Sequence, residues 1–194
     1  MSKKDRVLLH ICCGPCTLYP LKVLREQGVE VVGFFYNPNI HPYREFRRRI
    51  RALEEVSKIK DLEIIWDKEY GLRPFLRRVV FNENRRCEQC YYLRLNETVK
   101  KALEIKAEAF TTTLLYSRYQ AHNLIKEIAE DLSYRFKVPF LYHDFREGWE
   151  EGQAEAKALD IYRQPYCGCI YSEQERYDKK FRKRWKRGEF DEPF

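Results

Sequence analysis

The chain has 194 residues and a net charge of +7, with 37 lysine and arginine residues against 30 aspartate and glutamate residues. Its hydrophobic fraction of 44% supports one well-buried core, and no Gly/Ser-rich linker divides it. We therefore expect a single domain over residues 1–194, ending in a basic C-terminal segment from about residue 173 to 194. The N-terminal apolar stretch of five residues is too short for a signal h-region or a membrane span, so we expect a cytoplasmic protein without a membrane role.

Short apolar runs alternate with helical periodicity along the chain. Five runs predict strands, at residues 7–11, 29–36, 62–66, 109–114 and 138–142. A first helix is expected at about residues 18–27, closed by Gly28. Two later helices show apolar stripes at three- and four-residue steps, formed by Tyr43, Phe46, Ile50, Leu53 and Val56, and by Leu124, Ile125, Ile128, Leu132 and Phe136. This alternation predicts an α/β domain of three layers, with helices on both faces of a five-stranded parallel sheet.

Cysteines follow the first predicted strand, in the stretch HICCGPC. The ligand site of an open parallel sheet lies beyond the carboxyl ends of its strands, where Cys12, Cys13 and Cys16 are expected at the start of a helix. The positive end of that helix favours thiolates, so we expect all three thiols to be unusually acidic and ready to bind metal. In a reducing compartment, the seven cysteines are expected as metal ligands or redox groups rather than disulfides.

Two further cysteine pairs lie downstream. Cys87 and Cys90 form a C-x-x-C pair near a helix start, which is typical of half a four-thiolate metal site or of a redox dithiol. With Cys12 and Cys13 they make four ligands for a [4Fe–4S] cluster or a tetrahedral zinc ion, and the adjacent cysteines favour the cluster. Cys167 and Cys169 flank a glycine that lets a strained, easily reduced disulfide form. A reversible dithiol is the first interpretation of this pair, and additional metal ligation is the alternative.

The basic residues are clustered, at residues 43–51, 73–78 and 179–187. Such runs suit a polyanionic partner, although a solvated, ion-paired surface is the alternative interpretation. The last run carries Phe181 and Trp185 among its cations, a mixture suited to phosphate contact and base stacking. We therefore expect nucleic acid as the partner of the C-terminal run.

Five blocks, in order from near the start of the chain to Ser172, resemble a known family: LLHICCGPC, RCEQCYYLRL, TTTLLYS, HDFREG and YRQPYCGCIYS. They are similar to the cobalamin-independent epoxyqueuosine reductases, the QueH family. This resemblance implies the last step of queuosine synthesis, reductive removal of the epoxide of epoxyqueuosine at the wobble position of tRNA. It also implies an iron–sulfur cluster and a fold like that of the adenine-nucleotide α-hydrolases (HUP), with thiols replacing the nucleotide-binding loop.

The resemblance assigns roles to individual residues. The cluster ligands carry over to Cys12, Cys13, Cys87 and Cys90, and the redox pair carries over to Cys167 and Cys169. Apart from the resemblance, the reaction needs an acid to protonate the leaving oxygen, which makes Asp144 a candidate proton donor, or a ligand with Cys16 of an additional mononuclear iron, although a helix-capping aspartate fits HDFREG about as well. Tyr166 is another possible donor. For phosphate contact with a tRNA of queuosine-type anticodon, the candidates are Arg44, Arg47, Arg48, Lys183 and Arg184. An external electron donor is also required.

Three other functions are weighed against the reductase. A zinc-stabilised tRNA-binding module without turnover leaves the C-G-C pair unexplained. A thiol–disulfide oxidoreductase acting on proteins leaves Cys12, Cys13 and the basic tail without a role. A tRNA sulfur-transfer enzyme ordinarily needs ATP, and the loop after the first strand lacks a Ser-Gly-Gly-x-Asp-Ser type cradle for pyrophosphate.

Overall fold

A computed structural model describes residues 5–187 and contains a parallel sheet of four strands in the order β3-β2-β1-β4. The strands are β1 (Arg6–His10), β2 (Glu30–Phe35), β3 (Ile64–Trp66) and β4 (Ala109–Thr112). The central strands are apolar on both faces because helices cover both faces of the sheet. The strand order is that of doubly wound sheets, whose ligands bind where the direction of winding reverses, here between β1 and β4.

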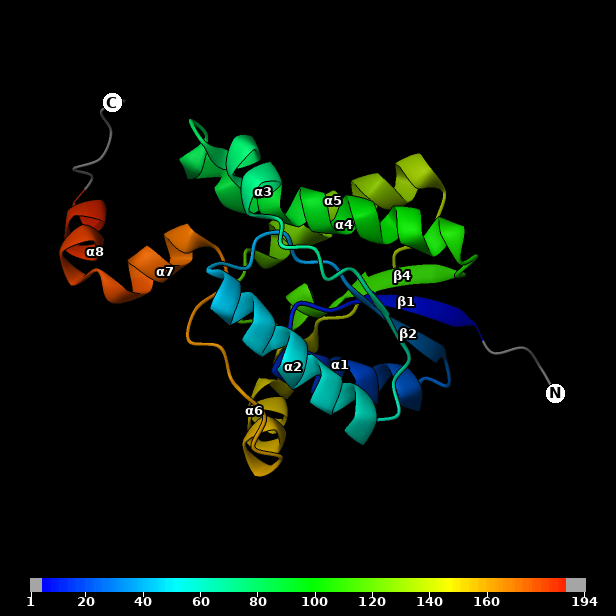
Figure 1. The fold of residues 1–194 in the computed structure, drawn as a ribbon. Coiled ribbons are helices and arrows are strands. Elements are labelled where there is room, and N and C mark those ends of the chain that lie inside the picture. The colour runs from blue at the N-terminus through cyan, green and yellow to red at the C-terminus, as the bar shows by residue number, and fades with distance from the viewer. Residues whose placement is uncertain (1–4, 188–194) are drawn as a thin grey trace.

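Helices form the two outer layers (Figure 1). One layer holds α1 (Gly14–Glu26), α2 (Tyr43–Ile59) and α6 (Trp149–Ala158), and the other holds α3 (Leu72–Val79), α4 (Arg86–Glu104) and α5 (His122–Phe136). Three short 3-10 helices cover Glu83–Arg85, Thr113–Tyr116 and Phe145–Gly148. The chain ends in α7 (Ile170–Tyr177) and α8 (Lys179–Lys186). The predicted three-layer α/β arrangement is therefore confirmed, and no helix in the described part of the chain is long and apolar enough to cross a membrane.

The expected fifth strand is reduced to a single bridge between Phe140 and Phe110. The Phe110 amide donates to the Pro139 carbonyl at 3.0 Å, and the Leu141 amide donates to the Phe110 carbonyl at 2.9 Å. Pairing stops there because Pro139 has no N–H to donate and because β4 passes directly into the 3-10 helix Thr113–Tyr116. The prediction of five strands is therefore not confirmed. The bridge does place residue 140 at the outer edge of β4, which is where a fifth strand would pair.

The apolar stripes predicted for the helices face the core, except for Tyr43, which has an exposed fraction of 54%. Phe46, Ile50, Leu53 and Val56 on α2 are almost completely buried. Gly14 lets α1 approach α2 closely, because a Cβ atom there would lie 2.8 Å from the Ala52 carbonyl oxygen. The start of α1, which carries the first cysteines, is thus fixed against α2 as well as against the sheet.

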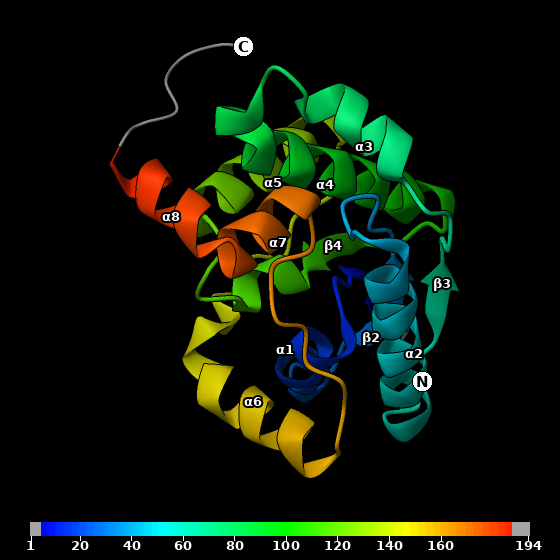
Figure 2. The ribbon, with the colours of Figure 1, turned by 60° about the vertical axis from the view of Figure 1, so that its left-hand side comes forward.

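A segment of irregular chain, residues 161–169, connects α6 with α7 and carries the C-G-C pair (Figure 2). We call it the strap. It runs beside the N-terminal end of α2, where the His41 amide donates to the Gly168 carbonyl at 2.8 Å. Gly168 has φ +154°, and a Cβ atom there would lie 2.9 Å from the Asn39 side-chain nitrogen. Glycine therefore allows the strap to lie against the loop after β2.

Candidate metal and redox site

The three cysteines after β1 lie together where the winding of the sheet reverses. Cys12 and Cys13 follow the strand directly, and Cys16 lies in the first turn of α1. The sulfur atoms of Cys12 and Cys13 are 3.7 Å apart, and all three sulfur atoms lie within 4.8 Å of one another. These three side chains are close enough to hold one metal ion, and residues 5–187 contain no other such group of three or more. We call them the thiol trio.

Thr113, the first residue after β4, ties the trio to the sheet. Its hydroxyl oxygen accepts a hydrogen bond from the Cys12 amide at 3.0 Å and lies 3.3 Å from the Cys12 sulfur, to which it donates. The two chain segments are 101 residues apart in sequence and meet only because β1 and β4 are neighbours. The reversal of winding thus brings a hydroxyl donor to a cysteine thiol.

The three thiols differ in acidity. Hydrogen bonds from the Cys13 and Cys16 thiols hold the pKa of Cys12 well below its ordinary value. Burial raises the pKa of Cys13, and hydrogen bonding to Cys12 and Cys13 raises the pKa of Cys16 well above its ordinary value. The expectation that all three are acidic is therefore wrong for Cys13 and Cys16, because a buried group of this size accommodates one negative charge more easily than three. Binding a metal ion would supply the positive charge that the other two thiolates need.

We call the other four cysteines, which lie near the starts of α4 and α7, the second thiol group. Cys87 and Cys90 lie in the first turn of α4, and Cys169 is the N-cap of α7, accepting the Ser172 amide at 3.4 Å. Cys90 and Cys169 are buried in one apolar cluster with residues of α3. Burial, together with the charges of Cys167, Cys169 and Cys87, raises the pKa of Cys90 to about 12 against the lowering effect of Arg94. The C-x-x-C pair and the C-x-C pair, 77 or more residues apart in the chain, are thus electrostatic neighbours.

The sequence placed Cys12, Cys13, Cys87 and Cys90 in one ligand set, and that set stays a prediction. In the structure Cys12 and Cys13 lie close to Cys16, whereas Cys87 and Cys90 are electrostatic neighbours of the C-G-C pair. A site that draws ligands from both groups therefore stays a proposal.

Arg94 lies between the two thiol groups and was missed by the sequence analysis. It follows Cys90 by one helical turn on α4 and has an exposed fraction of 2%. Its Nε donates to the Cys90 carbonyl at 3.3 Å, and its Nη2 is buried without a partner in the described part of the chain. Burial raises the pKa of Cys167 and Cys90, and the Arg94 charge opposes both rises. Its charge also acts on Cys12, after the stronger effect of the neighbouring thiols.

A buried guanidinium without a carboxylate partner is costly unless negative charge lies nearby. Cys12, whose pKa is lowered, is the thiolate that supplies negative charge here, whereas the pKa values of Cys90 and Cys167 are raised. Binding of a metal ion would turn the other thiols into thiolates, so the surroundings of Arg94 suit an anionic metal–thiolate centre. The spacing of Cys87, Cys90 and Arg94, at steps of three and four residues, is the helical signal from which the sequence could have indicated this residue.

Comparison with known proteins decides the family. A family model described as "Epoxyqueuosine reductase QueH" matches residues 7–175, which include all seven cysteines. The chain belongs to the QueH family. It is 38% identical to the epoxyqueuosine reductase QueH of Dehalococcoides mccartyi over 174 residues, or 90% of this chain and 96% of that protein. The QueH of Thermotoga maritima is 34% identical over 183 residues, or 89% and 93%. The longer QueH of Helicobacter pylori is 34% identical, and the match covers 49% of its length.

In this QueH chain a buried ion pair fixes the strap. Arg49 on α2 donates to the Glu45 carboxylate at 2.8 Å, to the Cys167 carbonyl at 2.7 Å and to the Tyr166 carbonyl at 2.9 Å. The Tyr162 hydroxyl donates to the other Glu45 oxygen at 2.6 Å. The exposed fractions of Arg49 and Glu45 are 2% and 4%. This network holds the C-G-C pair in place through hydrogen bonds to the backbone of the strap. The sequence analysis did not identify it, because Arg49 lies in the basic run at residues 43–51, which was interpreted as surface charge.

Two amide side chains donate to cysteine sulfur atoms. Gln164 of the strap donates to Cys13 at 2.9 Å and lies 3.6 Å from Cys16, so the strap covers the thiol trio. Gln120, just before α5, donates to Cys167 at 3.2 Å and accepts the Tyr91 hydroxyl at 2.7 Å. Each thiol group therefore has a neutral donor that stabilises a thiolate. Neither glutamine could be identified from the sequence, because both contacts join segments that are distant along the chain.

Asp144 takes the capping role that its motif allowed. Both of its oxygens contact the Arg146 guanidinium, and it accepts the Arg146 amide at 3.1 Å. Hydrogen bonds from Arg146 lower the pKa of Asp144 to about 2, so the carboxylate is ionised at neutral pH. It belongs to no group of three or more metal-ligand atoms in residues 5–187. The hydroxyl of Tyr166, the other candidate donor, donates to the His41 carbonyl at 2.5 Å.

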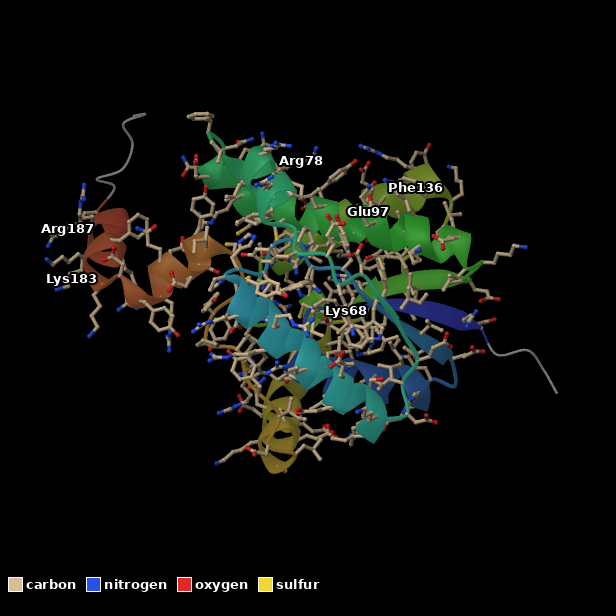
Figure 3. All side chains as sticks on the ribbon, in the orientation of Figure 1. Lys68, Arg78, Glu97, Phe136, Lys183 and Arg187 are labelled. Carbon is tan, nitrogen blue, oxygen red and sulfur yellow. The ribbon has the colours of Figure 1, made fainter. Side chains whose placement is uncertain are left out.

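The basic candidates for phosphate contact lie in two places. Arg44 and Arg48 on α2 are exposed and Arg47 is half-buried, all beside the strap that α2 holds. Lys183 and Arg184 are exposed on α8, which lies beyond α7 at the edge of the molecule, as the labels of Lys183 and Arg187 show in Figure 3. The side chain of Trp185, expected to stack on a base, lies outside the described residues.

Proposed function

We propose that this chain removes the epoxide oxygen of epoxyqueuosine at the wobble position of tRNA and leaves queuosine. Membership of the QueH family supports the reaction. The observation that carries the proposal is the pairing of a three-thiol metal site with a second group of four thiols, linked by the buried Arg94. A protein that only binds RNA has no need of two thiol groups around one buried cation.

The thiols present fit an iron–sulfur site. In a [4Fe–4S] cluster each cysteine binds its own iron, so the Cys12 and Cys13 sulfur atoms, 3.7 Å apart here, would separate when a cluster binds. Seven thiols also exceed the four that a [4Fe–4S] cluster requires. We assign Cys12, Cys13, Cys87 and Cys90 to the cluster, and Cys16 to an additional mononuclear iron. The unpartnered Nη2 of Arg94 fits the negative charge of such a centre.

The reaction needs two electrons and two protons. Both C–O bonds of the epoxide break, an alkene forms and the oxygen leaves as water. A bound [4Fe–4S] cluster supplies low-potential electrons one at a time. The Cys167 and Cys169 thiols together release two electrons and two protons when they form a disulfide, which balances the equation, and an external donor restores them. Cys167 is exposed and Cys169 is buried, so Cys167 is the thiol open to substrate.

The chain's own residues hold this pair in place. Arg49 fixes the Cys167 carbonyl, and Gln120 donates to the Cys167 sulfur and so favours its thiolate. Phe75 and Val79 surround Cys90 and Cys169 and keep water from them. Asp144 stays in the proposal as a candidate proton donor or iron ligand, although its ion pair with Arg146 must open before it can act.

The sheet order supports an architecture like that of the adenine-nucleotide α-hydrolases, which we include in the proposal. In these folds the loop after the first strand binds the ligand, and here that loop carries the thiol trio. The proposal also includes a tRNA partner with a queuosine-type anticodon and residence in the cytoplasm.

The test begins with anaerobic purification, iron and sulfide analysis and an electronic spectrum. The reduced protein is then incubated with epoxyqueuosine-containing tRNA, and the nucleosides are analysed by mass spectrometry. Cluster proportions of iron and sulfide with formation of queuosine support the proposal. Cys167→Ser and Cys169→Ser should each keep the iron and lose turnover. Zinc in place of iron, with the epoxide intact after cluster reconstitution, would indicate an RNA-binding module, and an ATP-dependent thiolated base would indicate sulfur transfer.

A further inference from the structure

The loop between α3 and α4 carries an almost completely exposed aromatic side chain. Phe81 has an exposed fraction of 97% and φ +62°, a left-handed backbone conformation that bulky residues rarely adopt. Neighbouring hydrogen bonds hold it: the Phe81 amide donates to Glu83 Oε1 at 3.2 Å, and the Asn82 amide donates to the Val79 carbonyl at 2.9 Å. The ring therefore adds strain to the loop, and no packing compensates that strain.

The position of this loop connects it with the second thiol group. On the inner face of α3, Phe75 and Val79 are fully buried and pack against Cys90 and Cys169. Residues 80–85 then turn the chain into α4, whose first turn carries the C-x-x-C pair. Figure 1 shows this hairpin at one end of the molecule, next to α7. Phe81 thus lies in the loop that joins the helix packed against Cys90 and Cys169 to the helix that carries the C-x-x-C pair.

The outer face of α3 carries uncompensated positive charge. Arg73, Arg77 and Arg78 are exposed, and the helix contains no acidic residue. Arg73 and Arg77 make no ion pair or hydrogen bond with any part of the chain that the structure describes. The Arg78 guanidinium, labelled in Figure 3, instead stacks over the ring of Tyr92 on α4 at 5.7 Å. Of the cations that follow the loop, Arg85 and Arg86 are already paired with glutamates.

We propose that Phe81 is a stacking platform for an unpaired base of the tRNA anticodon loop, with Arg73 and Arg77 contacting the adjacent phosphates. This inference rests on the proposed function, because it takes the loop next to the reacting base as the ligand. An exposed ring offers its π-face to any base, and the guanidinium groups on the helix that leads into the loop match a polyphosphate backbone. One phenyl ring with a partly exposed Val80 is too small for a stable protein interface, so charge complementarity identifies RNA as the partner.

The experiment measures the affinity of the reduced, iron-loaded protein for epoxyqueuosine-containing tRNA and for an isolated anticodon stem–loop at several salt concentrations. Phe81→Ala should weaken binding about 5- to 150-fold, the loss of one stacked base, without changing the salt dependence. Phe81→Trp should retain the affinity. Phe81→Asn, which suits a positive φ, should raise the melting temperature and still weaken binding. Arg77→Gln should reduce the slope of log K against log salt by about 0.7.

Tyr134→Ala provides the matched control, since Tyr134 on α5 is 76% exposed and also lies beside a cation. Its affinity should equal that of the unaltered protein. Equal affinity of Phe81→Ala and the unaltered protein, or an equal loss in Tyr134→Ala, overturns the inference. So does a Phe81→Ala variant that only dissociates a dimer, because the ring would then contact a second copy. Conversion of epoxyqueuosine to queuosine is measured separately on the unaltered protein. The binding measurements therefore test the stacking proposal, and the conversion assay tests the reductase proposal.

Discussion

The buried Glu45–Arg49 pair is predicted to hold the C-G-C strap, and Arg49→Met tests this directly. The substitution removes the hydrogen bonds to the Cys167 and Tyr166 carbonyls, and it leaves the buried Glu45 carboxylate with Tyr162 as its donor. Breaking a buried pair from one side costs about 3–5 kcal/mol, a large part of the 5–15 kcal/mol by which a domain is ordinarily stable.

The measurement is urea unfolding of the anaerobically purified protein, followed by circular dichroism. We expect Arg49→Met to lower the free energy of unfolding by about 4 kcal/mol. The double variant Glu45→Gln/Arg49→Met should lose less than the sum of the single variants, by about 1–3 kcal/mol, because no buried charge is then left unpaired. Arg51→Met, an exposed arginine on the same helix, should change the free energy of unfolding by less than about 0.5 kcal/mol.

A second measurement separates positioning of the strap from general stability. Under native conditions, mass mapping of iodoacetamide alkylation should show faster modification of Cys169, which has an exposed fraction of 7%, in Arg49→Met than in the unaltered protein. A destabilisation below about 1 kcal/mol, or strictly additive variants, would refute the buried-pair argument. An unchanged alkylation rate at Cys169 would show that the strap is held by other contacts.

Three further predictions concern the same region. Gly168→Ala should cost about 1–3 kcal/mol in urea unfolding, because φ is +154° and the added Cβ meets Asn39 at 2.9 Å. Gly28→Ala is the control, because Gly28 has φ +80° but open space around it, so this variant measures the cost of backbone strain alone. An equal loss of unfolding free energy in both variants would refute the contribution of the contact with Asn39. Burial lowers the pKa of His41 from 6.5 to about 4, so the unfolded chain binds more protons between these pH values and the free energy of unfolding falls by up to about 3 kcal/mol as the pH drops through them. His41→Phe should flatten this acid-side slope, and an unchanged slope would count against the assignment. Cys16→Ser should lower the iron bound per chain after anaerobic purification, and unchanged iron would remove Cys16 from the metal site.

The sequence predicts the layers of this fold well, because buried strands and amphipathic helices leave periodic apolar patterns. Residues 138–142 show the limit of such patterns: their apolar run is real, but Pro139 withholds the N–H that a ladder needs. Gly28 was placed correctly after α1, since positive φ is a local property.

The candidate site was likewise predicted in part from the sequence. The cysteines were found from their spacing, yet their division into a trio and a group of four depends on contacts between segments far apart in the chain. Arg49 and Arg94 were missed because composition records charge and not burial. For Asp144, its own motif supplied the capping interpretation, because the partner Arg146 lies two residues away.

The contact between Gln164 and Cys13 has a consequence for the biogenesis of the protein. The two residues are separated by 151 positions, so the thiol trio is translated long before the strap that covers it. At about 5–20 residues per second, the ribosome needs roughly 8 to 30 s to reach Gln164 after Cys13. During this interval Cys12, Cys13 and Cys16 are open to any thiophilic metal or oxidant in the cell. The metal found in a recombinant preparation therefore reflects the conditions of synthesis, and expression in iron-replete, oxygen-limited cells favours correct loading.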